Sequence, residues 1–281
     1  MSELEPVTES FGYASATHWS RVAEVVGSLS SPLSVTLARS VADQVVGKLK
    51  CESVLDIATG DGGLAFELAT QGAKVVGIDY SDVAIRQACK RSRQDMSLAT
   101  KFAVMNASYL SFADSSFDAV TFLRSYWVFP EIAPVLREVN RVLKRQGKLV
   151  IQLWGSPAQC SMITFGTAIL GKYLPELHVP SGVNGPFDIT VKDLSEYLGE
   201  CSFQNFSARH HMIEVEIRNI DDYWLNFRTL AGTAYFAFTQ QSQVTQKAVE
   251  AEWHNRWHAR LLRGAPPRLR LDWLICTAQK P

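Results

Sequence analysis

The chain has 281 residues, of which 47% are hydrophobic and 20% are charged, and its formal net charge is zero. This composition is that of a globular protein with a sizeable core. The neutral balance excludes the overall basic character of a nucleic-acid-binding protein, and no apolar run reaches the roughly 18 residues of a membrane span.

The cysteines and the N-terminal residues indicate the cellular compartment of the protein. None of the cysteines forms a CxxC pair, so the sequence predicts neither a zinc module nor a disulfide framework. The opening residues, "MSELEPVTES", lack the basic start and the apolar stretch of a signal peptide. We therefore expect a reduced, cytoplasmic protein. The five cysteines are Cys51, Cys89, Cys160, Cys201 and Cys276.

Residues 1–50 are expected to form an N-terminal helical cap, and residues 51–281 the main domain. A helical pattern begins near His18, and a second one follows Ser31. Ser31 is a candidate N-cap because its hydroxyl can accept a hydrogen bond from a free backbone N–H, and Pro32 suits the first helical position.

Strand and helix patterns alternate from residue 53 to residue 154. Strands are expected over 53–58, 74–79, 101–107, 117–125 and 148–154. Helices are expected over 63–72, over 81–94, and from 132 to a stop at Gly147. This alternation predicts parallel pairing in a doubly wound sheet, whose ligands lie at the carboxyl ends of the strands.

The remainder of the chain completes the sheet. A helix is expected after Thr190, and residues 206–217 and 269–280 read as a final antiparallel pair, which makes seven strands, mostly parallel. Residues from about 221 to 262, between these strands, form a helical insertion that we expect to be a substrate lid. Its aromatic residues are expected either to line an apolar pocket or to form the insertion's own core. They are Trp224, Phe227, Tyr235, Phe236 and Phe238.

A glycine-rich turn follows the first strand, in "VLDIATGDGGLA" (residues 54–65). Gly60, Gly62 and Gly63 let the backbone bend sharply and let a ligand approach closely. Asp79 ends the second strand and can accept hydrogen bonds from two ribose hydroxyls. Nicotinamide enzymes use the same arrangement, so these features alone indicate only an adenosine-type ligand.

The details of the turn favour a cofactor other than a dinucleotide. The G-x-G-x-x-G pattern fails, because Gly60 and Gly62 are followed by Ala65 and no glycine stands at position 58. Asp56 would repel a pyrophosphate. Its carboxylate instead suits a positively charged ligand, or orders the amides of the loop.

Four segments between Val54 and Trp154 carry a family resemblance. They are "VLDIATGDGGLA", "VVGIDYS", "MNASYLSFADSSFDAV" and "LREVNRVLKRQGKLVI". In this order they resemble class I S-adenosylmethionine-dependent methyltransferases, in the branch of ubiquinone and menaquinone biosynthesis. The resemblance implies a Rossmann-like methyltransferase fold, S-adenosyl-L-methionine as cofactor and a small molecule as methyl acceptor.

The resemblance also implies the cofactor-binding residues. The methionine portion would lie along Asp56, Ala58, Thr59, Gly60 and Gly62. Asp79 would take the ribose hydroxyls, with Tyr80, Asn106 and Ala107 beside the adenine and Leu123 and Arg124 beside the sulfonium. The sequence departs from the wider family at Ala58, where a glycine is usual, at Asp61, which adds a charge, and in "KRQGK", which replaces a proline-glycine-glycine turn.

No catalytic motif stands out, which suits this chemistry. In-line displacement on an electrophilic methyl group chiefly requires alignment and the exclusion of water. His18, Arg124 and His178 are candidates for a general base or an oxygen ligand. His254 and His258 have the i, i+4 spacing of metal ligands, but no third ligand follows, so we expect no metal site.

The sequence thus predicts methyl transfer to a small apolar or aromatic metabolite of secondary metabolism, without nucleic acid or stable membrane insertion. Two alternatives stay open at this point. One is a cyclase-type enzyme on the same fold that retains S-adenosylmethionine as a structural ligand. The other is a nicotinamide-dependent oxidoreductase. The acceptor atom and the oligomeric state are not predicted.

Overall fold

Seven strands form one sheet in the computed structural model, which describes residues 15–27, 30–174, 185–262 and 268–281. The spatial order is β3-β2-β1-β4-β5-β7-β6. The strands β1 to β5 pair in parallel, and β7 runs antiparallel between β5 and β6, which confirms the predicted fold class. The strands are β1 (Ser53–Ile57), β2 (Lys74–Asp79), β3 (Thr100–Val104), β4 (Phe117–Phe122), β5 (Leu143–Trp154), β6 (Gln204–Glu216) and β7 (Arg268–Gln279).

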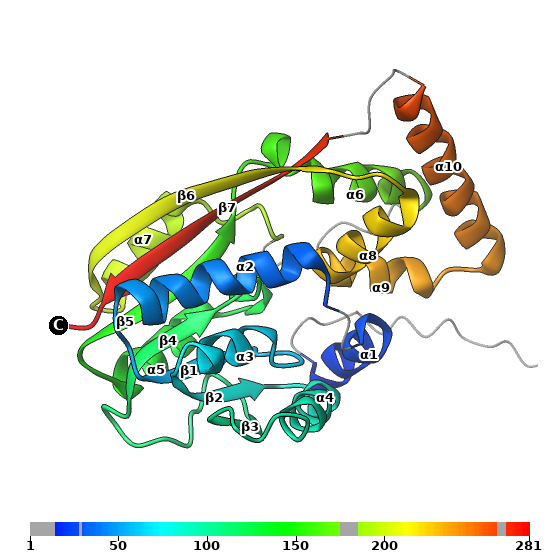
Figure 1. Ribbon diagram of the computed structural model, residues 1–281. Coiled ribbons are helices and arrows are strands. Elements are labelled where there is room, and N and C mark those ends of the chain that lie inside the picture. The colour runs from blue at the N-terminus through cyan, green and yellow to red at the C-terminus, as the bar shows by residue number, and fades with distance from the viewer. Residues whose placement is uncertain (1–14, 28–29, 175–184, 263–267) are drawn as a thin grey trace, which may run out of the picture.

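Helices cover both faces of the sheet and build two hydrophobic cores. One core joins the sheet to α2, α3 and α6, and the other joins it to α5 and α7. Figure 1 shows α2 lying across one face. The helices are α1 (Ala16–Val26), α2 (Pro32–Ala42), α3 (Gly63–Thr70), α4 (Asp82–Ser92), α5 (Ile132–Val142), α6 (Ser161–Tyr173), α7 (Val191–Glu200), α8 (Ile220–Leu230), α9 (Gly232–Thr239) and α10 (Gln243–Leu261). Short helical turns are η1 (Asp43–Lys48), η2 (Tyr126–Val128) and η3 (Pro157–Gln159).

Side-chain caps start the helices where the sequence predicts them. The Ser31 hydroxyl accepts a hydrogen bond from the Ser34 amide at 3.2 Å, and Pro32 is the first residue of α2. The Ser81 hydroxyl caps α4 in the same way, and the Thr190 hydroxyl caps α7. A cap of this type stabilises a helix by about 1 kcal/mol.

The predicted end of α5 at Gly147 is wrong. The helix ends at Val142, and the fully buried Leu143 is already extended and pairs with Phe117 of β4. Gly147 lies inside β5, where an added Cβ would come within 2.7 Å of the Lys144 carbonyl oxygen. The glycine therefore permits a close backbone approach rather than a helix stop.

Two predicted strands end earlier than expected. β3 stops at Val104 instead of residue 107, and the Asn106 side chain then accepts the Ser108 amide at 2.9 Å in a local turn. β4 stops at Phe122 instead of residue 125, because Arg124 takes a left-handed conformation with φ of 58°.

The insertion between β6 and β7 is helical, as predicted, and consists of α8, α9 and α10 (Figure 1). Trp253 of α10 is fully buried at its centre, with the Trp224 ring 4.1 Å and the Phe227 ring 5.3 Å away between centroids. Phe238 and Tyr235 pack on Trp224 at 5.6 and 5.9 Å. These four predicted pocket aromatics thus pack in a core that the insertion shares with α2 and α6.

The candidate metal pair on α10 faces solvent. His254 and His258 are exposed, while Trp253 and Trp257 on the adjacent face of the helix are buried. Across the described ranges, no group of three or more histidine, cysteine or acidic side chains is arranged to hold a metal ion.

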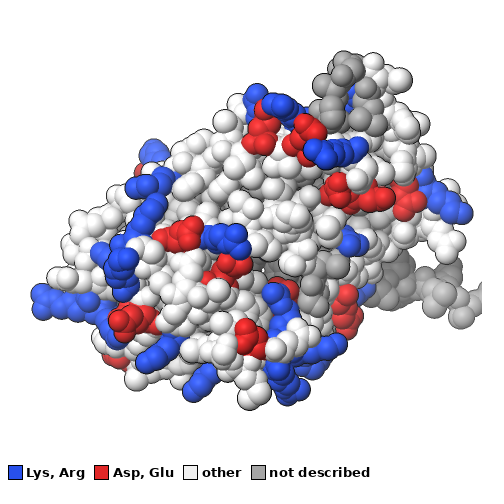
Figure 2. All heavy atoms as spheres, in the orientation of Figure 1, with Lys and Arg blue, Asp and Glu red and all other residues white. Residues whose placement is uncertain are grey.

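Surface charge and hydropathy agree with the composition. Figure 2 shows acidic and basic side chains intermixed over the visible face.

All five cysteines have free thiols. Within the described part of the chain, no helix combines the length and the apolar character that crossing a bilayer requires.

Candidate active site

A cavity of about 1150 Å³ lies at the carboxyl ends of β1, β2 and β4. Its walls come from the turn after β1, the end of β2, the loop after β3 and the segment after β4. Further walls come from α1, α6 and the junction of α8 with α9. The position is the one that a doubly wound sheet offers for ligands.

The turn after β1 is built from left-handed residues. Ala58, Gly60 and Gly62 have φ values of 53°, 59° and 85°. Ala58 therefore stands where glycine is favoured and stores strain of roughly 1–2 kcal/mol. An added Cβ at Gly60 would meet no atom within 4 Å, so the backbone there is open to the cavity. At Gly62 an added Cβ would lie 2.7 Å from the Phe66 ring, so this glycine serves packing.

Asp79 ends β2 at the wall of the cavity and fixes the turn. One carboxylate oxygen accepts the Gly60 amide at 2.9 Å, and the other accepts the Ser81 amide at 2.9 Å. Burial raises the pKa of Asp79, and the backbone hydrogen bonds oppose this effect. Each oxygen keeps a lone pair beyond the one that the backbone uses.

Asp56 lies beneath the turn. Its carboxylate is buried and accepts the hydroxyls of Thr59 and Thr121, each at 2.7 Å. Burial raises its pKa to about 6. Asp56, Thr59 and Gly62 are not among the residues that line the cavity. The hydrogen bonds of Asp56 and Thr59 order the loop. Contact of Asp56, Thr59 and Gly62 with a cofactor stays a prediction.

The adenine-side residues of the prediction do line the cavity. Tyr80 is 42% exposed and follows Asp79, and Asn106 and Ala107 form the wall beyond it. The Met105 amide donates to the Asp79 carbonyl at 2.9 Å, which ties this wall to β2. Contact with a cofactor at these positions stays a prediction.

Leu123 and Arg124 line the cavity at the end of β4. The Arg124 amide donates to the Gln152 side chain at 3.1 Å, and its guanidinium donates to the Thr229 carbonyl at the end of α8. Burial lowers the pKa of Arg124, whereas the charge of Asp61 raises it. Within the described residues, Arg124 Nε and the Ser125 hydroxyl are buried without a hydrogen-bond partner. Buried donors of this kind indicate a place for a polar ligand group.

Asp61, the unexpected charge in the turn, forms an ion pair with Arg91 of α4. The Arg91 guanidinium also lies 4.7 Å from the centre of the Phe66 ring. The charge of Asp61 is thus compensated at the edge of the cavity, so it does not disqualify the turn for a cofactor.

His18 reaches the cavity from α1. Its ring meets Phe236 of α9 edge-on at 5.6 Å between centroids, and both residues line the cavity. Burial, and then the charge of Arg21, lower the pKa of His18, which favours the neutral imidazole. Phe236 is the one residue of the five predicted pocket aromatics that lines this cavity. The third candidate, His178, lies outside the described residues.

Sequence reasoning missed much of the apolar wall. On α1, Trp19, Val22, Ala23 and Val26 line the cavity. On α6, Ile163 and Thr167 do so, and on α9, Thr233 and Ala237. Their spacings of three and four residues are those of one helix face, and this periodicity was the available signal. The pattern alone does not show whether such a face meets a ligand or a core.

Comparison with known proteins identifies the family. Residues 55–151 match the family described as "Methyltransferase domain". The ubiquinone/menaquinone biosynthesis C-methyltransferase UbiE of Rickettsia prowazekii is 32% identical over 213 residues, which cover 72% of this chain and 86% of that protein. A demethylmenaquinone methyltransferase of Thermotoga maritima is 36% identical over 136 residues, which cover 47% of this chain and only 57% of that protein.

Solved structures share the fold. The phosphoethanolamine N-methyltransferase 2 of Haemonchus contortus has a TM-score of 0.58 at 17% identity, covering 95% of this chain and 58% of that chain. The [4+2]-cyclase SpnF has a TM-score of 0.52 at 20% identity, covering 86% of this chain and 81% of that chain. At these identities the likeness concerns the fold alone.

The fold and the site define a Rossmann-like protein with one large cavity at the carboxyl ends of its parallel strands. The chain belongs to the class I S-adenosylmethionine-dependent methyltransferases, in the branch related to ubiquinone and menaquinone biosynthesis. This membership decides against the nicotinamide-dependent oxidoreductase that the glycine turn left open.

Proposed function

We propose that this protein transfers a methyl group from S-adenosyl-L-methionine to a small apolar or aromatic acceptor. One observation carries the proposal: a single cavity joins the Gly60 and Asp79 turn to an apolar wall from α1, α6 and α9. Its volume of about 1150 Å³ is slightly above the upper end of the roughly 300–1,000 Å³ usual for ligand pockets, which supports space for a cofactor and a small acceptor side by side.

The residues present fit the cofactor. The open backbone at Gly60 leaves space for close approach, and the Asp79 carboxylate retains lone pairs for ribose hydroxyls. Tyr80, Asn106 and Ala107 would border the adenine. Bound there, the cofactor supplies an electrophilic methyl group on a sulfonium.

The chain's own part is alignment, exclusion of water and polar contact with the acceptor. Arg124 Nε and the Ser125 hydroxyl are donors for an oxygen of the acceptor. His18 is the candidate to accept a proton because it lines the cavity, and burial lowers its pKa so that the imidazole is neutral. His18 and Phe236 come from α1 and α9, so these two helices would together close the acceptor end of the cavity.

The names of the relatives guide the choice of acceptor. Both belong to enzymes of quinone biosynthesis, so a demethylated quinol with a short side chain is the first acceptor to test. We also propose that the acceptor is a metabolite of a secondary pathway and that the protein is cytoplasmic. Both of these proposals rest on the sequence alone.

The test has two stages. Calorimetry with S-adenosylhomocysteine should give saturable binding at one site per chain. Incubation with labelled S-adenosylmethionine and a panel of phenolic, quinol and carboxylic acceptors should give a product that has gained one methylene. If the protein does not bind S-adenosylhomocysteine, the proposal is refuted. A product of unchanged mass, formed only by the cofactor-bound protein, would instead establish the cyclase-type chemistry.

A further inference from the structure

The loop from 105 to 116, between β3 and β4, forms one wall of the cavity without any helix or strand of its own. Its residues 105–109 all line the cavity and include Asn106 and Ala107. The other face of the loop lies on the last turns of α5. What holds the loop there also determines the shape of the cavity wall.

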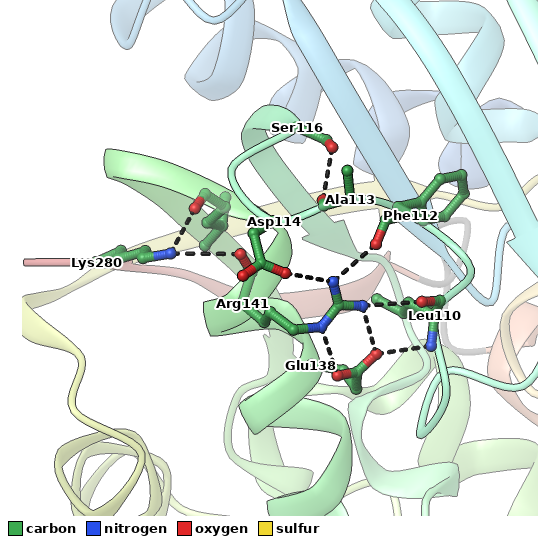
Figure 3. A network of polar contacts seen from close by, with 9 residues as sticks. Leu110, Phe112, Ala113, Asp114, Ser116, Glu138, Arg141 and Lys280 are labelled. Atoms are coloured by element: carbon green, nitrogen blue, oxygen red, sulfur yellow. Dashed lines mark hydrogen bonds and ion pairs between the residues drawn. The ribbon is translucent and has the colours of Figure 1, made fainter.

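Arg141 of α5 binds the loop by its backbone (Figure 3). Its Nη2 donates to the Leu110 carbonyl at 2.8 Å, and its Nη1 donates to the Phe112 carbonyl at 2.7 Å. Nη1 also donates to the Asp114 carboxylate at 2.8 Å. A planar guanidinium can meet several acceptors at once in this way, whereas a lysine ammonium cannot reproduce the geometry.

Glu138, one turn earlier on α5, fixes the guanidinium. Its two oxygens accept Arg141 Nε and Nη2, each at 2.8 Å, in a bidentate pair. One of these oxygens also accepts the Leu110 amide at 2.8 Å. Leu110 is thus held at both its N–H and its C=O, directly after the last cavity-lining residue of the loop. The pair lowers the pKa of Glu138 and raises that of Arg141, so both remain charged.

The far end of the loop is tied to the same helix. The Ser115 amide donates to the Arg141 carbonyl at 3.0 Å, and the Ser116 amide donates to the Val142 carbonyl at 2.7 Å. Lys280, from the end of β7, reaches the Arg141 carbonyl at 3.4 Å. The loop therefore has fixed anchors from residue 110 to residue 116, and of its residues only 105–109 line the cavity.

We infer that Glu138 and Arg141 are positioning residues for the cofactor: they hold the wall of residues 105–109 in its binding shape, although neither lines the cavity. The inference rests on the proposed function, because it assumes that this wall meets the adenosine part of the cofactor. Preorganising a wall lowers the cost of ordering it when the ligand binds. Loss of the pair should therefore weaken cofactor binding more than it impairs methyl transfer.

The test compares Arg141→Met with wild type. We expect the dissociation constant of S-adenosylhomocysteine to rise about tenfold or more and the KM for the cofactor to rise in parallel. The kcat at saturating cofactor should stay within about twofold. Arg141→Lys should recover only part of the affinity, and Glu138→Gln should resemble Arg141→Met. Hydrogen exchange should become faster at amides 105–116 and stay unchanged in β1.

A matched control separates positioning from general loss of stability. Val139→Ala removes a fully buried side chain from the same helix and leaves the Glu138 and Arg141 pair intact. It should lower the melting temperature and leave the dissociation constant unchanged. Equal weakening of binding by Val139→Ala and Arg141→Met would overturn the inference, as would unchanged binding by Arg141→Met. If wild type itself does not bind S-adenosylhomocysteine, the proposed function fails instead.

Discussion

The Asp79 carboxylate accepts a hydrogen bond from the Gly60 amide at 2.9 Å, which joins the end of β2 to the turn after β1. These two residues are 19 positions apart in the chain and both line the cavity. The proposed function gives Asp79 two tasks, because the carboxylate that would bind the ribose also holds the turn against which the cofactor would lie.

Substitution of Asp79 should weaken cofactor binding strongly. Asp79→Ala removes the acceptor of the Gly60 and Ser81 amides and the proposed partner of two ribose hydroxyls. A hydrogen bond to a charged group contributes roughly 1.5–3 kcal/mol. The two ribose bonds share one carboxylate and are not additive, so we expect binding of S-adenosylhomocysteine to weaken about 10- to 100-fold. Calorimetry measures this, with the exposed Asp95→Ala as a control. An unchanged dissociation constant would remove Asp79 from the cofactor site.

Gly60→Val should abolish cofactor binding and keep the fold. The φ of 59° is unfavourable for a β-branched residue, and the new side chain would project into open space on the cavity side. Circular dichroism should stay near that of wild type, whereas calorimetry should detect no binding. Gly199→Ala, which also meets no neighbouring atom but lies on α7, should change neither measurement. Tight binding by Gly60→Val would show that the turn does not contact the ligand.

Because of Asp56, the free energy of unfolding should fall as the pH rises from about 4 to 6. Its folded pKa of about 6 lies above the unfolded value of 3.8, so the native state binds the extra proton in this window. At about 1.36 kcal/mol per pKa unit, the loss across the window is roughly 3 kcal/mol. Asp79 acts in the same direction because its pKa is also raised.

Denaturant unfolding of wild type and Asp56→Asn at pH 4 and pH 7 measures this effect. The stability of wild type relative to Asp56→Asn should be higher at pH 4 than at pH 7. Asp118 has its pKa lowered to about 2, so its contribution is lost only as the pH falls below about 4. Parallel stability curves for the two proteins between pH 4 and pH 7 would contradict the prediction.

A bulky residue on α9 should block the acceptor while sparing the cofactor. Ala237 lines the cavity one turn after Thr233. Ala237→Trp should leave S-adenosylhomocysteine affinity within about tenfold, or roughly 1.4 kcal/mol, and abolish methyl transfer. Val244→Trp, at an exposed position on α10, is the control. Normal turnover by folded Ala237→Trp would exclude α9 from the acceptor site.

A point substitution is the sharper test because the insertion is not a detachable lid. Tyr223 and Phe227 of α8 are fully buried in the core that also contains α2 and α6. The Leu33 amide of α2 donates to the Asn226 side chain at 3.4 Å. Replacing residues 221–262 by a short turn would therefore expose the main core and confuse loss of function with loss of fold.

The sequence by itself determined the sheet, the helix starts and the position of the glycine turn and Asp79 at the carboxyl ends of the strands. Those features depend on local signals: apolar runs, capping residues such as Ser31 and Ser81, and a glycine turn followed at fixed distance by Asp79. Most of these signals act between residues that are close in the chain. The alternation of strands and helices also restricts the order of the strands in the sheet.

Only the tertiary structure decided which side chains face the cavity. Asp56 turns under the loop because Thr59 and Thr121 supply its partners, and Trp224 turns into the insertion because Trp253 lies opposite. Arg141 acquires its role because three of its hydrogen bonds reach a loop that folding brings to it. Each of these outcomes depends on a partner distant in sequence or on the far side of a turn, and periodicity carries no information about that partner.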